Sequence, residues 1–166
     1  MLISDDRFGI AKFVYIDPVT LESKHINTFV ILWLTIMSLL NTIKSLSEKY
    51  SQQVVELRRH LHANPELSYE EFNTVKYVAQ QLRSFGIEPT EVATTGLLAE
   101  IKGKNPTKRT IALRADMDAL PIVEKNSFPY KSKNPGVMHA CGHDVHTSSL
   151  LGTAKILNEV KDQFEG

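Results

Sequence analysis

The sequence has a single cysteine, Cys141, so no disulfide can form within the chain. It also has no excess of either charge, because 19 basic and 19 acidic side chains cancel. A chain without net charge has no long-range field to draw it to nucleic acid or to an anionic membrane. The lack of a disulfide framework is typical of a reducing compartment. We therefore expect a cytoplasmic protein with no nucleic-acid partner.

One stretch, from Ile26 to Ile43, contains no charged residue. Its most apolar part, residues 29–40, is shorter than the roughly 20 apolar residues of a membrane span. A signal peptide fits less well, because no Ala-x-Ala-like cleavage residues follow the stretch. We expect residues 1–36 to be either a non-native extension, with translation beginning at Met37, or an apolar or disordered leader. A membrane-anchored form that uses this stretch is the alternative.

Two helices are predicted in the first half of the chain. Apolar residues recur at helical spacing over residues 39–61, and this helix should end near His62, before a proline. Ser68 and Glu71 have the spacing of a capping box. A second helix should therefore begin after Ser68 and end near Gly86, because glycine commonly terminates helices.

Two short apolar segments, residues 96–103 and 110–115, are predicted to be strands, because a polar, turn-like segment separates them. A long loop rich in Pro, Lys and Asn follows over residues 121–137, and its length makes it a candidate functional loop. Apolar residues at helical spacing then predict a third helix after His146. Helices that cover strands indicate an α/β or α+β domain.

Three of the six histidines lie between His139 and His146, together with Cys141 and Asp144. Thiolate and imidazole are good ligands for divalent ions, and the glycine between Cys141 and His143 lets both side chains converge. Cys141 and His143 are therefore candidate metal ligands. The alternative is that the cysteine only packs and the histidines are ordinary surface or core residues.

Asp116 and Asp118 follow the second predicted strand and are two residues apart, which places them on one face of that strand. Ligands gather at strand ends in open α/β sheets, where carboxylates can bridge two metals or orient a histidine ligand. The alternative is a solvated loop. Four other residues are interpreted as structural: Arg114 and Glu124 as members of ion pairs, and His60 and His62 as residues on a helix surface.

Three long motifs, in this order, resemble the metal-dependent amidohydrolases of the aminoacylase and carboxypeptidase group. This family includes hippurate hydrolase, N-acyl-L-amino acid amidohydrolase, N-acetyldiaminopimelate deacetylase and the plant hydrolases of auxin conjugates. The first motif covers residues 57–62 with 65–67, the second residues 112–122, and the third residues 138–147. The resemblance extends over residues 54–166.

The resemblance implies an α/β catalytic domain, with helices packed on a mixed sheet, that hydrolyses the amide bond of N-acyl amino acids with metal-activated water. It implies two divalent ions, manganese or zinc, with Cys141 and His143 as ligands and Asp118 as the catalytic carboxylate beside them. Asp116 stands where other branches of the group place a histidine ligand. His146 is a further candidate ligand.

By the same resemblance, residues 37–166 are the N-terminal part of the catalytic domain, and the complete protein acts on a small N-acyl amino acid or related amide, as a homodimer. The Gln-Pro-Ala-Glu-Glu segment that supplies the general base would follow Gly166. Because two protein ligands hold a metal weakly, we expect this chain alone to be inactive. The alternative is a short non-catalytic binding or interaction protein that keeps the scaffold.

Overall fold

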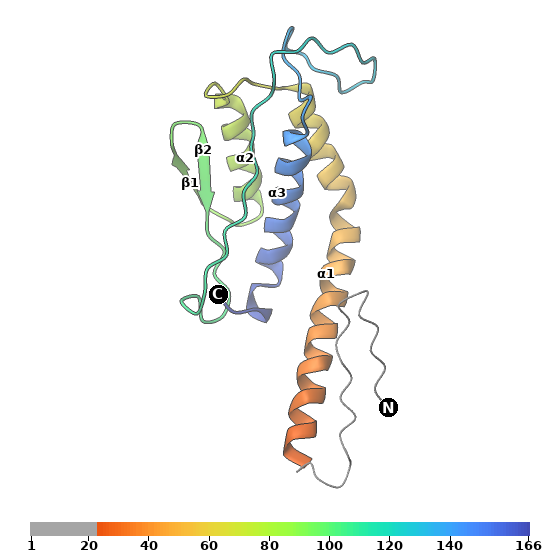
Figure 1. Cartoon of the computed structure of the whole chain (residues 1–166), viewed down its shortest axis with the longest axis vertical. Helices are drawn as coiled ribbons and strands as arrows, with labels where there is room; N and C mark the ends of the chain where they lie inside the picture. Colours follow the sequence, from red (N-terminus) through yellow and green to blue (C-terminus); the bar gives the residue numbers. More distant parts are fainter. Residues whose placement is uncertain (1–22) are drawn as a thin grey trace, which may run out of the picture. The chain divides into compact units, whose positions relative to one another are not determined.

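Helix α1 runs from Ser23 to Ala63 (Figure 1). The structure is a computed structural model and describes residues 23–166. The predicted end of this helix is confirmed, because α1 stops two residues before Pro65. The helix begins much earlier than its predicted start at residue 39, and the first 22 residues of the predicted leader lie outside the described residues. The chain divides into two units, residues 1–41 and 42–166, with α1 contributing to both.

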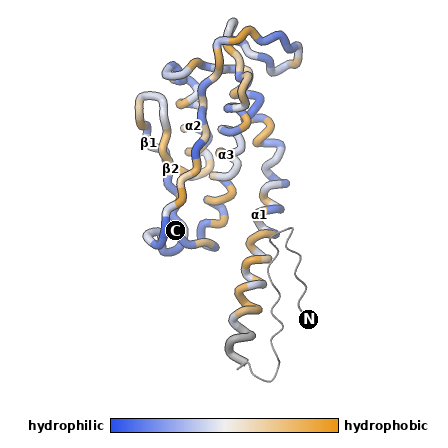
Figure 2. The backbone as a smooth tube through the Cα atoms, in the orientation of Figure 1, coloured by the Kyte–Doolittle hydropathy of each residue, from blue (hydrophilic) through white to orange (hydrophobic). Residues whose placement is uncertain are grey.

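The described helix of the first unit is strongly apolar, as the hydrophobic colouring along it in Figure 2 shows. Most of the large apolar side chains between Phe29 and Leu40 are exposed. The hydroxyl of Thr35 donates to the carbonyl of Ile31 at 2.8 Å, which satisfies this polar group within the helix. The stretch Thr28–Ala63 is long and apolar enough to cross a membrane, a test of length and composition that core helices and signal sequences also pass.

The second unit is built around three helices. The C-terminal part of α1 packs with α2 (Phe72–Ser84) and α3 (His143–Glu159), and Figure 1 shows the three side by side. Gly152 allows α3 to approach α1 closely, since a Cβ there would lie 2.6 Å from Val54 Cγ2. Six buried apolar residues form the core cluster: Leu57, Leu61, Val78, Leu82, Ile87 and Leu151.

A small hairpin lies against α2 and completes this unit. Strand β1 (Pro89–Val92) pairs antiparallel with β2 (Gly96–Ala99), so that Pro89 is opposite Ala99. A short 3-10 helix, η1 (Lys161–Gln163), follows α3. Helices packed on a sheet are therefore confirmed. The sheet of the described residues is antiparallel rather than mixed, and parallel pairing occurs there only as isolated bridges.

The strand predicted at 110–115 is wrong, and the one predicted at 96–103 is shorter than expected. An apolar segment becomes a strand only when a neighbouring backbone offers hydrogen bonds, and no described strand lies beside residues 110–115. The sequence does not predict strand β1, because residues 89–92 lack the apolar alternation of a half-buried strand. In the structure, three of these four residues are exposed. Strand β2 therefore pairs with β1, which ends four residues before it, and not with the strand predicted at 110–115.

Helix α2 ends as predicted but begins differently. At its C-terminus, Gly86 has a φ of +76°, and the amides of Gly86 and Ile87 donate to the carbonyls of Arg83 and Leu82, the two hydrogen bonds of a Schellman motif. At its N-terminus, the predicted capping box is wrong, because α2 begins only at Phe72.

The carboxylate of Glu66 takes the capping role instead. It accepts hydrogen bonds from the amides of Asn73 at 3.0 Å and Thr74 at 2.7 Å, the second and third residues of the helix. The chain between α1 and α2 is thereby held against the start of α2.

The loop predicted over residues 121–137 is confirmed as irregular. The amide of Leu120 donates to the carbonyl of Met138 at 3.0 Å, and the amide of Met138 donates back at 2.9 Å. These two hydrogen bonds hold the two ends of the loop together. Within it, Lys133 donates its amide to Ala63 O at 2.9 Å, which ties the loop to the end of α1.

We expect Glu66→Ala to lower the free energy of unfolding by about 1 to 2 kcal/mol, because two amides at the start of α2 lose a charged acceptor. Urea denaturation of the full chain measures this change. Ser68→Ala is the matched control and should change stability by less than about 0.5 kcal/mol. A larger loss of stability for Ser68→Ala than for Glu66→Ala would support the predicted capping box and would contradict the capping role of Glu66.

Candidate metal centre

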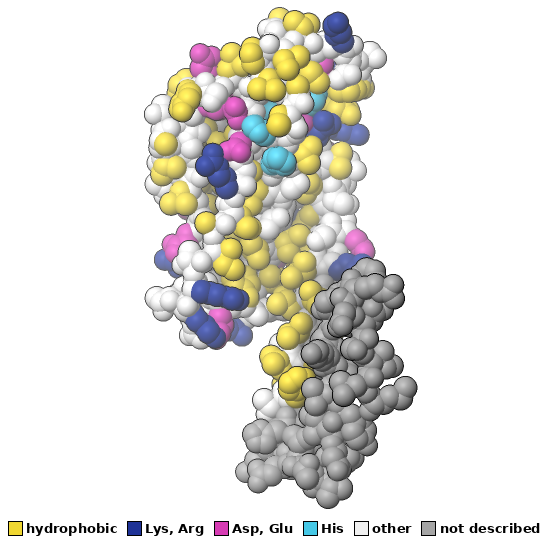
Figure 3. Space-filling view, in the orientation of Figure 1, with side chains coloured by type: hydrophobic (Ala, Val, Ile, Leu, Met, Phe, Trp, Pro, Cys, Tyr) yellow, Lys and Arg dark blue, Asp and Glu magenta, His cyan; other side chains and the backbone are white. Residues whose placement is uncertain are grey.

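The three sequence motifs meet through backbone pairing. Leu67, from the first motif, forms a parallel bridge with Ala119 of the second, and the amide of Ala119 donates to Glu66 O at 2.7 Å. Leu120 of the second motif pairs with Met138 of the third. Histidine and acidic side chains gather on the face drawn in Figure 3. Residues that are far apart in sequence are thus brought to one end of the three helices.

Asp118 and His143 are in direct contact. His143 Nδ1 lies 2.9 Å from Asp118 Oδ1 and 3.0 Å from its carbonyl oxygen. Because both neighbours are acceptors, Nδ1 donates the proton and Nε2 remains available. This is the arrangement in which a carboxylate fixes the tautomer of a metal-ligating histidine.

Helix α3 begins at His143, directly after Gly142, whose φ is +123°. An L side chain rarely adopts this backbone conformation, so a glycine is required where the chain turns from Cys141 into the helix. The turn sets the direction in which His143 leaves the start of α3. Cys141 is exposed and its thiol is free.

Asp116 lies beside both histidines of the first turns of α3. The hydrogen bonds from Arg114, at 2.9 Å and 2.7 Å, lower the pKa of Asp116, and the charges of His143 and His146 lower it further. The predicted ion pair of Arg114 is therefore confirmed. The carbonyl of Asp116 accepts a hydrogen bond from the Thr147 hydroxyl at 2.9 Å, which fixes this segment to α3.

His146 lies one turn along α3 from His143, and their ring centroids are 5.9 Å apart. The structure thus places Asp116, Asp118, His143 and His146 at the same end of α3. In residues 28–166, however, no three His, Cys, Asp or Glu side chains converge closely enough to hold an ion. The donor chemistry fits a divalent metal, while metal ligation by Cys141, His143, Asp116 and His146 stays a prediction.

His62 is buried, with 2% of its surface exposed, so the predicted helix-surface role is wrong. Its Nδ1 lies 2.8 Å from Asp144 Oδ2, and its Nε2 lies 3.1 Å from Glu124 Oε1. Arg58, one turn earlier on α1, also contacts Asp144 at 2.8 Å. Helical spacing alone did not show this role. No signal in the local sequence separates His62 from His60, because both adjoin Leu61 and only His62 is buried.

The predicted surface role of His60 is confirmed. Its ring is exposed and stacks on Tyr77 with centroids 3.7 Å apart. Partial burial lowers the pKa of His60, and the charge of Lys133 lowers it further. His60 and His62, two residues apart, therefore face opposite environments, as the helical turn requires.

Glu124 anchors the 121–137 loop. Burial raises the pKa of this carboxyl, but hydrogen bonds from the Ser132 amide, the Asn126 side chain and His62 together lower it below the usual value. Glu124 is thus held as a carboxylate in contact with the His62 ring. The contact with His62 is an ion pair only when that ring is protonated, so the predicted ion-pair role of Glu124 stays a prediction.

His139 is buried beside this network, and its ring centroid lies 6.4 Å from that of His62. Burial lowers the pKa of His139, although the charge of Asp144 opposes that shift. Neither ring nitrogen has a hydrogen-bond partner among the described residues. A buried imidazole with both nitrogens free has donor and acceptor capacity for a group that binds next to the Asp118–His143 pair.

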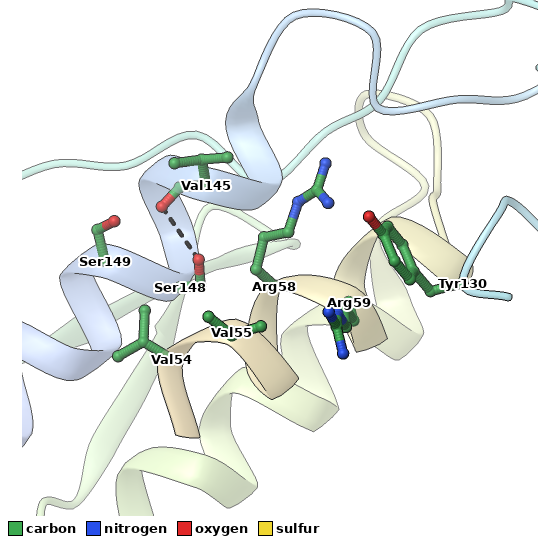
Figure 4. Close-up of a pocket in the computed structure, with 8 residues that line it drawn as sticks. All are labelled: Val54, Val55, Arg58, Arg59, Tyr130, Val145, Ser148 and Ser149. Atoms are coloured by element: carbon green, nitrogen blue, oxygen red, sulfur yellow. Dashed lines mark hydrogen bonds between the residues drawn. The ribbon is translucent and has the colours of Figure 1, made fainter. Parts of the chain in front are cut away.

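A separate groove lies between α1 and α3 and has a volume of about 290 Å³. The ring of Tyr130, from the loop, is 5.3 Å from the guanidinium of Arg58 and 5.0 Å from that of Arg59. Figure 4 shows these side chains and the hydrogen bond from the Ser148 hydroxyl to Val145 O. None of the predicted site residues lines this groove, so it is distinct from the candidate metal centre.

Comparison with known proteins agrees with the motifs. Residues 112–166 match the sequence model of Peptidase family M20/M25/M40. An N-acyl-L-amino acid amidohydrolase of Geobacillus stearothermophilus is 51% identical over 125 residues, which are 75% of this chain and 34% of that protein. Thermostable carboxypeptidase 2 of Saccharolobus solfataricus is 46% identical over 132 residues, which are 78% of this chain and 33% of that protein.

A solved structure shares the fold. The YXEP protein of Bacillus subtilis, described as a dinuclear metal binding peptidase from the M20 family, superposes with a TM-score of 0.65 at 44% identity. The match covers 69% of this chain and 32% of that one. The resemblance to the metal-dependent amidohydrolases is therefore confirmed. The chain spans about a third of the length of the relatives it matches and covers their N-terminal part.

We expect His62→Ala to lower the free energy of unfolding by about 3 to 5 kcal/mol, because two carboxylates lose their shared partner in a buried site. Thermal and urea unfolding of the full chain measure the loss. His60→Ala is the matched control on the same helix, and its cost should stay below about 1 kcal/mol. Equal effects for the two variants would mean that the buried network contributes nothing specific.

Lowering the pH should reduce the free energy of unfolding, in part because Glu124 becomes protonated. Its pKa is lower in the folded chain than in the unfolded chain, so its contribution is present above the ordinary glutamate pKa and is lost as the pH falls through the folded value. Unfolding measured from about pH 6 to about pH 3 should show a smaller loss of stability for Glu124→Gln than for the wild type. Glu70→Gln, at an exposed position, should follow the wild type. Identical pH slopes for Glu124→Gln and the wild type would contradict the assignment.

Proposed function

We propose that this chain forms the N-terminal part of the catalytic domain of a metal-dependent amidohydrolase that cleaves the amide bond of N-acyl amino acids. The observation that carries the proposal is the contact between Asp118 and His143, which leaves His143 Nε2 free at the end of α3. The relatives' names support the substrate class, since one is an N-acyl-L-amino acid amidohydrolase and another an N-acetyl-L-cysteine deacetylase.

In this proposal, Cys141 and His143 hold a divalent ion, either zinc or manganese, from the turn that begins α3. Asp118 accepts a hydrogen bond from His143 Nδ1–H and so fixes the orientation of the ring. The other ring nitrogen, Nε2, is then available to bind the ion. Asp116 and His146 lie at the same end of α3 as further candidate donors, but no three of these side chains converge closely enough in the described residues to hold the ion. A bound divalent ion supplies a Lewis acid that polarises the amide carbonyl and makes water more acidic.

The chain by itself is proposed to be inactive. Cys141 and His143 are two ligands, whereas catalytic metal sites are normally held by three or more protein side chains. Among the described residues, no third His, Cys, Asp or Glu side chain lies close enough to these two to bind the same ion. Completion of the site therefore requires donors from the remaining two thirds of the length of the relatives.

The test is a chimera in which residues 42–166 replace the matching part of the Geobacillus stearothermophilus relative. The chimera should release acetate from N-acetyl amino acids, and the 166-residue chain should not. Cys141→Ala in the chimera should lower metal content and activity together, by about 10- to 100-fold or more, because one ligand is lost. Metal analysis of the purified protein and an amine-release assay measure both.

Ser149→Ala is the matched control, because this exposed residue lines the groove between α1 and α3 rather than the candidate metal centre. It should leave metal content and turnover unchanged. A Cys141→Ala chimera that keeps its metal and its activity would overturn the proposal. So would turnover by the 166-residue chain alone, because the site would then be complete without further donors.

A further inference from the structure

Asp144, in the first turn of α3, is anchored to α1. Its Oδ2 lies 2.8 Å from His62 Nδ1 and 2.8 Å from Arg58 Nε, and its Oδ1 accepts a hydrogen bond from the Val145 amide at 2.9 Å. Only 1% of the Asp144 side chain and 3% of the His62 side chain are exposed. The contact between them therefore lies inside the described part of the chain, and burial keeps any further segment of a longer protein from reaching it.

The turn before α3 does not fix the direction of the helix start by itself. Gly142 has a φ of +123°, and a glycine has more conformational freedom than any other residue. Cys141, on the other side of this glycine, is exposed and its thiol is free. The orientation of His143 therefore depends on contacts that α3 itself makes, and Asp144 is the next residue of the helix.

Helical geometry connects Asp144 to His143. Neighbouring residues of an α-helix point about 100° apart around its axis, so fixing one of them fixes the direction of the other. A rotation of about 20° moves an atom at a helix radius of about 5 to 6 Å by about 2 Å. A metal site accepts deviations of only about 0.2 Å in its ligand distances. The contacts of Asp144 with α1 therefore hold His143 where its Nδ1 lies 2.9 Å from Asp118 Oδ1.

We propose that His62 is a positioning residue for the candidate ligand His143 and that it acts through Asp144. The inference rests on the proposed function, because it gives His62 a part in the metal centre proposed there. The His62 ring holds the Asp144 carboxylate, this carboxylate fixes the first turn of α3, and the turn orients His143. Glu124 Oε1, 3.1 Å from His62 Nε2, keeps the ring directed at Asp144.

The test compares two substitutions of His62 that differ by one methylene group. In His62→Asn, the amide nitrogen is as many bonds from the backbone as Nδ1, so a donor to Asp144 is kept. In His62→Gln, the amide nitrogen is as many bonds from the backbone as Nε2, so the contact with Glu124 is kept and the one with Asp144 is lost. Both variants keep a polar group in the buried site.

The measurement is the ¹⁵N NMR spectrum of the His143 ring in the full 166-residue chain, with chelator present. At about pH 8 an unperturbed imidazole is neutral, so the spectrum gives the ratio of its two tautomers. The wild type and His62→Asn should both favour the Nδ1–H form that Asp118 accepts. His62→Gln should lower the ratio of Nδ1–H to Nε2–H about tenfold, because the hydrogen bond to the Asp118 carboxylate is weakened.

Two further variants separate positioning from general loss of stability. Leu82→Ala, in the core on α2, destabilises the fold without removing a contact of Asp144, and it should keep the wild-type ratio. Asp144→Asn keeps the shape of the side chain but removes the charge that strengthens its hydrogen bonds, so it should lower the ratio as His62→Gln does. Equal ratios for His62→Gln and His62→Asn, or an equal fall with Leu82→Ala, would overturn the inference.

A Zn²⁺ titration of the chimera distinguishes this inference from the proposed function. His62→Gln should weaken Zn²⁺ binding by about tenfold or more relative to His62→Asn, as loss of an outer partner of a ligand does. A chimera with no substitution that binds no Zn²⁺ would contradict the proposed function itself. A chimera that binds Zn²⁺ equally tightly with either substitution would contradict only the role of His62.

Discussion

A buried imidazole lies between two carboxylates at the point where the three sequence motifs meet. His62 belongs to the first motif, Glu124 follows the second, and Asp144 belongs to the third. Each carboxylate would be costly to bury alone, and the ring is the partner that the two share, beside Arg58 for Asp144 and the Ser132 amide for Glu124. One side chain at the end of α1 thereby fixes both the long loop and the first turn of α3.

The candidate metal centre depends on that arrangement. Because Asp144 is held by His62, the preceding residue, His143, leaves the helix start in a defined direction toward Asp118. The backbone pairing of Leu120 with Met138 brings the second motif to the same end of α3. The turn that carries the candidate ligands is thus supported by the contacts of Asp144 with His62 and Arg58 and by the main-chain hydrogen bonds between Leu120 and Met138.

The sequence predicted the C-terminal ends of α1 and α2 well, because the proline at position 65 and the glycine at position 86 are local signals, but it predicted neither helix start. It also predicted that the Asp118 and His143 segments belong together, although that came from the resemblance rather than from spacing. It failed where long-range partners decide the outcome. The 110–115 segment has a strand-like composition, yet no described strand pairs with it.

His62 and Glu66 show the same limit for side chains. Each looks like an ordinary polar residue beside a helix end, but one is buried between carboxylates and the other caps a helix that begins six residues later. No local pattern distinguishes these roles from solvent exposure. Ser68 has the local capping pattern, yet the amides at the start of α2 bind Glu66.

The most direct test of the central role of His62 is a double-mutant cycle between His62 and Glu124, with His62→Ala, Glu124→Ala and the double variant unfolded in urea. If the ring and the carboxylate act as a pair, the coupling free energy should reach about 1 to 3 kcal/mol. The same cycle between His60 and Glu124 should be additive. Additivity within about 0.5 kcal/mol for His62 and Glu124 would contradict the account, since the two groups would then contribute independently.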